Sequence, residues 1–476
     1  MRRAILLAFV ALYGCASAPA YRSSSVRPPA SFREVTEDPH PLAPSPDGRG
    51  GTQNGPVVSR DYWDQLGDTT LSRLVGEVLR ANLDVRSARA RVSAARSDRV
   101  RSVLDLTPSA TVAAGYSRQR LSTASFPGAL GVFADQNVWD AGVNASWDLD
   151  VFGGIRHTVQ ARGALADVAE ESLRDVQVTM SAEVARAYFE LRGAQEQLEV
   201  ARRNAENQRH TFELTQERLA AGRGSAFDTE RAQAQLSSTL ASIPAREAQV
   251  AAAQYRIGTL VGRSPTEVAR ELEQIGPLPS LPEVTSIGTP DAVVRYRPDV
   301  AAAERFAAAQ GALVGAAKAS YLPRLTIGGS AGYAAPEFNA VGNQGTLRYV
   351  VGPVITWPGL NLGRVKAEVD AAQAREDAAR AQYGRAVLAA TEDIETSLAR
   401  YRAARLQVER LQEASAASER AAELARLRFR EGITDFLQVL DAERTELEAQ
   451  DRLAQGRIDA ATAYAALYKA IGGPLS

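Results

Sequence analysis

Residues that build metal centres and disulfide frameworks are scarce in this sequence. Its 476 residues include only one cysteine, two methionines and three histidines. Because Cys15 has no second cysteine to pair with, no disulfide can form within the chain. His40, His157 and His210 are scattered and lack cysteine partners, so no metal site with a recognisable spacing can be drawn. We therefore expect no metal and no other cofactor.

Catalytic signatures are also missing. The pairs Gly153-Gly154 and Gly328-Gly329 lie beside expected strands, but neither forms a phosphate-binding loop, and no nucleophile lies in a catalytic motif. The 55 basic and 56 acidic residues are interspersed along expected helices and leave a net charge of −1. A nucleic-acid binder would concentrate positive charge instead. We predict that the protein is not an enzyme and has no nucleic-acid partner.

The apolar run at the N-terminus is short. Residues 4–12 are nine apolar positions (12 − 4 + 1), too few to cross a bilayer as a helix, and they follow Met1-Arg2-Arg3. Residues 1–14 therefore indicate a targeting segment. The cysteine that follows Gly14 resembles a bacterial lipobox, although Tyr13 is unusual there, and Ala16 then implies the outer membrane. A conventional secretory signal with a chance cysteine is the alternative; we favour a lipid on Cys15.

Proline is confined to certain segments, and these divide the chain. Residues 15–60 contain eight prolines without hydrophobic periodicity, which predicts an extended, lipidated N-terminal arm. Residues 264–290 contain five more and are expected to be a crossover between two halves. The halves are residues 61–263 and 291–473.

Proline is absent from residues 156–221 and 364–431, and each stretch predicts the first helix of a helical hairpin. Residues 364–431 span 68 positions (431 − 364 + 1), about 100 Å as one helix, with Val387, Ile394, Tyr401 and Val408 at every seventh position. This chain segment turns at Gly432 and returns, giving a hairpin over residues 364–472. An earlier hairpin over residues 156–262 turns at a glycine 210 positions before (432 − 222). The halves are therefore an internal duplication.

Shorter elements precede each hairpin in the same order. Helices are expected over residues 69–80 and 83–104, with counterparts at 291–296 and 300–320. Alternation of apolar and polar residues then predicts strands at about 107–120 and 138–150, and at about 323–335 and 346–357. Their lengths are near those of tilted membrane-crossing strands.

One face of the expected strands is apolar and carries aromatic residues near its ends, as in a membrane barrel. We predict that the lipid-facing set includes Trp139, Trp147, Tyr349, Ile355 and Trp357. The alternative is a soluble sheet with this face on a core. Four strands cannot close a barrel, and open edges in lipid cost several kcal/mol per unpaired group. Several copies must then share one barrel, with eight strands from two or twelve from three.

Several motifs resemble those of the TolC-type outer-membrane factors, in particular the lipidated NodT- or OprM-like branch. They are Ser146-Trp147-Asp148-Leu149-Asp150-Val151-Phe152-Gly153, Gly222-x-x-Ser225-x-x-Asp228, Arg297-Pro298-Asp299-Val300, and Arg428-x-x-x-Gly432 followed by Asp435-Phe436-Leu437. Each is short, but their order and duplicated spacing make the resemblance specific.

The resemblance implies a mainly α fold with a membrane β-barrel. Three copies would form one 12-stranded outer-membrane barrel and a coiled-coil α-helical tunnel in the periplasm of a Gram-negative bacterium. The implied function is the exit channel of a tripartite efflux system for drugs or other small toxic compounds. Its implied partners are further copies of itself as a homotrimer, a periplasmic adaptor protein and an inner-membrane pump of the resistance-nodulation-division (RND) type.

The two glycine turns are expected to be the periplasmic tips that meet the adaptor. This set comprises Gly222, Ser225, Asp228, Arg428, Gly432, Thr434 and Asp435. Thr434 stands where the family is frequently acidic, so Thr434 and Asp435 are both candidates for the narrowest ring. Alternatively, Asp228 and Asp435 cap the returning helices.

A second hypothesis from another class is a structural coiled-coil lipoprotein that spaces or scaffolds the envelope without conducting. The alternating strands discriminate between the two, because a spacer needs no ribbon with one apolar and one polar face.

Overall fold

The computed structural model describes residues 28–29, 31–33, 62–120, 135–284, 287 and 289–473. Cys15, the targeting segment and most of the arm over residues 15–60 lie outside them. The chain falls into two compact units, each drawn from both halves of the sequence. We name them the strand unit (described residues 91–170 and 302–383) and the hairpin unit (described residues of 25–90, 171–301 and 384–473).

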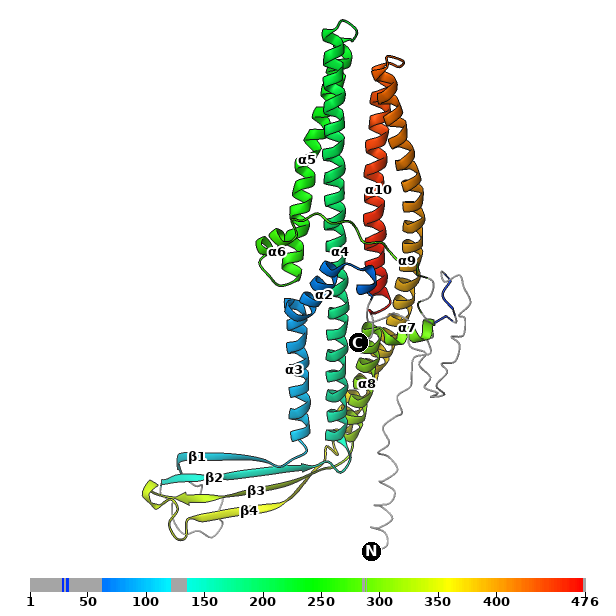
Figure 1. Ribbon diagram of the computed structural model, residues 1–476. Coiled ribbons are helices and arrows are strands. Elements are labelled where there is room, and N and C mark those ends of the chain that lie inside the picture. Colours follow the sequence, from blue (N-terminus) through cyan, green and yellow to red (C-terminus); the bar gives the residue numbers. More distant parts are fainter. Residues whose placement is uncertain are drawn as a thin grey trace, which may run out of the picture. The chain divides into compact units, whose positions relative to one another are not determined.

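The strand unit contains one antiparallel sheet in the order β1-β2-β3-β4 (Figure 1). Its strands are β1 (Ser109–Gln119), β2 (Gln136–Leu149), β3 (Arg324–Ala335) and β4 (Leu347–Thr356). The central pair joins the two halves of the sequence, since Val143 of β2 lies opposite Ala331 of β3. A Cβ added to Gly332 would lie 2.4 Å from the Ala141 carbonyl oxygen, so this close pairing requires glycine there.

Four helices are connected along the chain to the strands of this sheet. They are α3 (Leu83–Leu104), α4 (Gly154–Ala220), α8 (Pro298–Ala319) and α9 (Leu362–Arg430). The short 3-10 helix η4 (Phe338–Ala340) lies between β3 and β4. Asp150 explains the motif that links β2 to α4: its carboxylate oxygens accept the backbone N–H groups of Ile155 at 2.9 Å and Arg156 at 2.8 Å. These bonds satisfy N–H groups that the first helical turn leaves unpaired.

The hairpin unit consists mainly of the two helical hairpins, whose turns lie at the same end of the unit (Figure 1). In the first, α4 is followed by α5 (Ala226–Leu260); in the second, α9 is followed by α10 (Phe436–Ala470). Smaller elements accompany them, namely η2 (Asp64–Leu66), α2 (Thr69–Ala81), α6 (Pro265–Glu271) and α7 (Pro290–Tyr296). No helix in the described part of the chain is both long and apolar enough to span a bilayer.

Glycine ends each of the four hairpin helices in the same way. At the end of α4, the Gly222 N–H donates to the Leu219 carbonyl at 2.9 Å and the Arg223 N–H to the Arg218 carbonyl at 2.8 Å. This is a Schellman motif, which needs a left-handed residue, and Gly222 has φ +69°. The pattern recurs at Gly262, Gly432 and Gly472, with φ +70°, +75° and +85°.

The most aromatic part of the core lies in the hairpin unit. This aromatic cluster comprises Tyr62, Trp63, Tyr188, Phe189, Tyr401, Tyr464 and Tyr468, all buried. The rings of Tyr62 and Tyr464 stack at 4.6 Å, and the Tyr62 hydroxyl donates to the Tyr464 carbonyl at 3.0 Å. Burial raises the pKa of Tyr464 to about 12, so its hydroxyl stays neutral in the core.

Candidate functional site

The register of the sheet places most of the apolar residues of the four strands on one face. Ala331 is opposite both Val143 and Tyr349, and Ile327 is opposite Trp147. This apolar face carries Val112, Tyr116, Trp139, Val143, Trp147, Leu149, Leu325, Ile327, Tyr333, Leu347, Tyr349, Val351, Pro353 and Ile355. Four of the five residues predicted to face lipid are therefore on one face, and Trp357 follows β4 by one residue. Their contact with lipid stays a prediction.

The opposite face is mostly polar. It carries Ser109, Thr111, Ser117, Gln119, Asp140, Asn144, Ser146, Asp148, Arg324, Thr326, Ser330 and Arg348, interrupted by Val138, Val350 and Val354. Side-chain contacts that cross between strands on this face include the Ser109 hydroxyl donating to the Ser146 carbonyl at 3.2 Å. The Thr326 hydroxyl donates to Asp148 at 2.5 Å, and Arg348 lies 3.8 Å from Asp140. A sheet with one apolar and one hydrated face suits the boundary between lipid and a water-filled lumen.

Aromatic rings mark both ends of the apolar face. At the helix end, Trp147 Nε1 donates to the Leu106 carbonyl at 2.9 Å and Trp357 Nε1 to the Tyr321 carbonyl at 3.0 Å. The two tryptophans are equivalent in the duplication (357 − 147 = 210). Amphipathic rings of this kind are enriched at membrane interfaces.

At the loop end, Trp139 packs against Tyr116 and Phe338, with ring centroids 4.6 and 5.3 Å away. Sequence reasoning missed Phe338. It lies in the connection between β3 and β4, outside the alternating pattern that identifies strand residues.

The hairpin tips show which of the predicted residues cap the returning helices. Asp435 caps α10, since its carboxylate accepts the Gln438 N–H at 3.2 Å. The corresponding cap of α5 is Ser225, whose hydroxyl accepts the Phe227 N–H at 3.1 Å. The hypothesis that Asp228 caps α5 is therefore wrong. Asp228 lies in the first turn of α5, where its negative charge interacts favourably with the helix N-terminus.

The two candidates for the narrowest ring differ in exposure. Asp435 is exposed, whereas Thr434 is half-buried and its hydroxyl has no hydrogen-bond partner among the described residues. Arg428 is exposed and contributes its backbone carbonyl, which accepts the Ile433 N–H at 2.9 Å. The aperture and adaptor roles of the tip residues stay predictions.

A contact that sequence reasoning missed joins the two tips. Arg218 of α4 donates from Nη1 to the Phe429 carbonyl of α9 at 2.8 Å, and its guanidinium lies 4.4 Å from the centroid of the Phe429 ring. Phe429 also packs in an apolar tip cluster with Ala232, Phe436, Val439 and Leu440. An arginine in the last turn of α4 is visible in the sequence, but its partner 211 positions away (429 − 218) is not.

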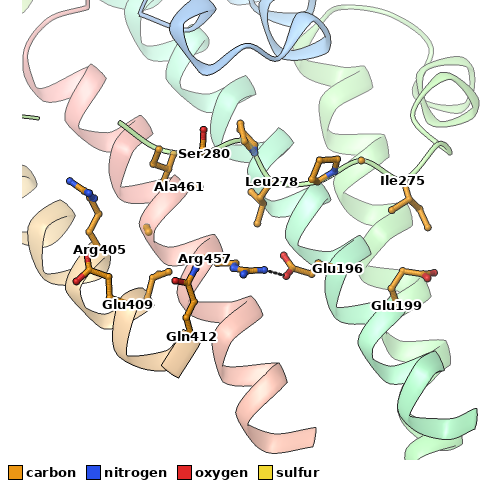
Figure 2. Close-up of a pocket in the computed structure, with 16 residues that line it drawn as sticks. Glu196, Glu199, Ile275, Leu278, Ser280, Arg405, Glu409, Gln412, Arg457 and Ala461 are labelled. Atoms are coloured by element: carbon orange, nitrogen blue, oxygen red, sulfur yellow. Dashed lines mark hydrogen bonds and ion pairs between the residues drawn. The ribbon is translucent and has the colours of Figure 1, made fainter. Parts of the chain in front are cut away.

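A cleft of about 780 Å³ lies where the crossover segment passes over α4, α9 and α10 (Figure 2). Its lining includes Glu196, Glu199, Arg405, Glu409 and Arg457, and Arg457 pairs with Glu196. Within the described residues, no group of three or more histidine, cysteine or acidic side chains is placed to hold a metal ion. The five charged side chains named here are three glutamates and two arginines, so the cleft carries charge of both signs.

Comparison with known proteins gives one consistent result. The profile of the family described as "Outer membrane efflux protein" matches residues 74–263 and 290–473. The pyoverdine export outer membrane protein OpmQ of Pseudomonas aeruginosa is 29% identical, over 98% of this chain and 96% of its own. The probable outer membrane lipoprotein SilC of Salmonella typhimurium is 27% identical, over 85% and 86%.

Among solved structures, the outer-membrane channel OprN superimposes with a TM-score of 0.85 at 35% identity, over 97% of this chain and 99% of its own. This likeness confirms the fold class predicted from the sequence. The chain belongs to the outer membrane efflux protein family.

Proposed function

We propose that this protein is the outer-membrane exit channel of an efflux system. The observation that carries the proposal is the four-stranded sheet, which has an apolar face with aromatic ends and a polar face. Among the described residues, its outer strands β1 and β4 each have only one neighbouring strand. Efflux relatives with nearly full-length coverage support it. The protein is a transport channel and not an enzyme.

Several copies of the chain must share one barrel, because the sheet of a single copy has two open edges. A sheet in lipid cannot leave the outer edges of β1 and β4 unpaired, because each exposed backbone group there costs several kcal/mol. Three copies supply twelve strands, enough for a water-filled lumen, whereas eight strands leave an interior filled by side chains. We therefore propose a homotrimer.

The remaining parts of the system are also proposals, which membership of the family supports. We propose that a lipid on Cys15 anchors the chain in the outer membrane, and that the tips around Gly222 and Gly432 contact a periplasmic adaptor. An inner-membrane pump of the RND type supplies the energy and selects the cargo, drugs or other small toxic compounds. The channel itself conducts passively.

Two neighbouring valines on β4 provide a matched test. Val350 and Val351 are 65% and 72% exposed in the single chain and lie on opposite faces of the sheet. If Val351 faces lipid, Val351→Arg costs about 2–4 kcal/mol and prevents insertion. Val350→Arg, in the lumen, is tolerated and lowers cation conductance. The measurements are outer-membrane fractionation, native mass of the purified complex, and conductance in planar bilayers.

Equal tolerance of both substitutions would contradict the membrane assignment of the sheet. A wild-type complex that forms and inserts but never conducts, even after Asp435→Asn, would instead support the structural spacer.

A further inference from the structure

The two hairpins meet along a row of polar residues where a coiled coil normally places apolar ones. One row of buried positions on α4 has a spacing that alternates between four and three: Gln197, Ala201, Asn204, Gln208, Thr211 and Thr215. Only Ala201 in this row is apolar. Leu198, Val200 and Ala205 are also buried in this stretch of α4, outside the row. Glu443, Glu446 and Gln450 of α10 are also buried, each 7% exposed or less. We name the six residues of the row and these three residues of α10 the polar seam.

Direct hydrogen bonds connect the two sides of the polar seam. The Asn204 amide donates to Gln450 at 2.8 Å, and the Thr211 hydroxyl donates to Glu443 at 2.7 Å. On α10 itself, the Gln450 amide donates to Glu446 at 3.3 Å. The contact between the hairpins is therefore specified here by polar groups, and water can replace each of these partners when the helices separate.

Two buried carboxyl groups in the polar seam share one arginine. Arg426 Nη1 of α9 lies 3.5 Å from Glu443 and 3.2 Å from Glu446, whose side chains are 5% and 4% exposed. The other charged groups that act on this pair are Glu419 of α9 and Arg203 of α4, both at Glu446. One close cation cannot balance two buried carboxylates, so the arrangement favours retention of a proton.

Burial raises the pKa of both Glu443 and Glu446 above the ordinary value of 4.5, with Thr211 and Arg426 opposing the rise at Glu443. The buried amide of Gln208, one turn from Thr211 on α4, has no hydrogen-bond partner among the described residues. While the hairpins are packed, the polar seam therefore holds polar and ionisable groups away from water without a hydrogen bond or counter-charge for each of them. Separation of the hairpins returns these groups to solvent.

We propose that Glu443 and Glu446 together hold a proton while α4 and α10 are packed, and release it when the hairpins separate. Acid then keeps the hairpins together, and a rise in pH favours their separation at the tips. If the protein is the proposed exit channel, this separation widens its periplasmic end. The proton linkage itself does not depend on conduction.

The sign follows from linkage between proton binding and conformation. A carboxyl whose pKa is raised in the packed state stabilises that state below its ordinary pKa, near 4.5. The stabilisation is lost as the pH rises through the packed-state pKa. For one linked proton, the ratio of separated to packed hairpins increases by up to about tenfold per pH unit within this window.

The test measures the distance between the hairpin tips directly. Spin labels at Arg223→Cys and Glu431→Cys, on the exposed turns, report this distance by pulsed electron resonance in the purified full-length protein between pH 4.5 and pH 8. In otherwise wild-type protein we expect the longer-distance population to grow as pH rises. In Glu443→Gln/Glu446→Gln the distribution should be independent of pH, because neither side chain can titrate.

Glu448→Gln is the matched control, since Glu448 is on the same helix but 58% exposed. It should respond to pH as the wild type does. The proposal is overturned if the double glutamine variant keeps the wild-type pH response, or if the long-distance population shrinks as pH rises. Conductance recorded in parallel separates the two questions: a pH-dependent distance without conductance would contradict the channel and leave the proton linkage supported.

Discussion

The aromatic cluster and the polar seam join the same two helices, α4 and α10, by opposite means. In the aromatic cluster, Trp63 lies between Phe189 of α4 and Tyr464 of α10, with ring centroids 6.4 and 6.2 Å away. In the polar seam, the same helices exchange hydrogen bonds between amides, hydroxyls and carboxyls. Each buried aromatic ring removes about 150–250 Å² of surface from water, whereas a hydrogen bond exchanged with water contributes only about 1 kcal/mol. The difference indicates one permanent contact and one that can open.

The largest expected effect comes from breaking the permanent contact. Tyr464 is fully buried and contacts Tyr62, Trp63 and Tyr401. Tyr464→Ala should lower the free energy of unfolding by about 3–5 kcal/mol, because it leaves a large cavity. Denaturant titration in detergent measures this change. Tyr255→Ala, at a residue 48% exposed on α5, should cost much less; equal losses would show that the cluster has no special role.

A smaller loss of folding free energy is expected from a substitution that removes a contact to the C-terminal end of α10. Buried Arg297 donates to the Ala470 carbonyl at 2.7 Å and pairs with Asp299 and Asp393, which are 40% and 59% exposed. Solvent screens both carboxylates, so most of the destabilisation caused by removing Arg297 should come from the Ala470 carbonyl, which would lose this hydrogen-bond donor. Arg297→Ala should cost about 1–3 kcal/mol in the same titration. Arg295→Ala, at an exposed ion pair two residues earlier, is the control and should be nearly neutral.

Asn82 gives an independent check of this role. In the first half of the sequence its amide donates to the Leu260 carbonyl at 2.8 Å, which is equivalent to Ala470 (470 − 260 = 210). Asn82→Ala should destabilise the end of α5 by a similar amount. A neutral result at both positions would contradict the assignment.

Making the polar seam resemble the aromatic cluster should stabilise it. Gln208→Leu replaces a buried amide that lacks a protein partner with an apolar group of similar size, for an expected gain of about 1–2 kcal/mol. The same variant should reduce the separated population in the tip-distance measurement. Gln216→Leu, outside the buried positions of the seam, should change neither quantity, and a destabilised Gln208→Leu would show that the seam depends on this amide.

The smallest effect is expected at the tips. Arg218→Ala removes a hydrogen bond to the Phe429 carbonyl and a cation–π contact, about 1 kcal/mol in total at this partly exposed site. The ratio of separated to packed hairpins at a fixed pH should increase severalfold. Arg218→Lys should restore only part of the contact, because lysine lacks the planar guanidinium. Arg420→Ala, at an exposed residue of α9, is the control, and a larger separated population there than in Arg218→Ala would contradict the assignment.

Sequence periodicity was a good guide where local geometry decides structure. Helix α3 begins at Leu83 and ends at Leu104, as predicted, and the ends of the four strands lie within a few residues of their expected positions. The apolar set from Trp139 to Ile355 also shares one face, because alternation fixes the side of every strand residue. Asp228 shows the limit: Ser225 and Asp228 are both acceptable caps, and only the backbone path of the turn selects Ser225.

The sequence by itself determined the duplication, the glycine turns and the two-faced strands, since these depend on residues near one another in the chain. Only the tertiary structure showed that Arg218 contacts Phe429. It also showed that Arg426 lies beside both Glu443 and Glu446, and that Thr211 of α4 donates to Glu443. A heptad pattern shows that a position is buried but not which helix covers it. The charge balance of a buried group depends on that neighbour, so it is decided only when the hairpins pack.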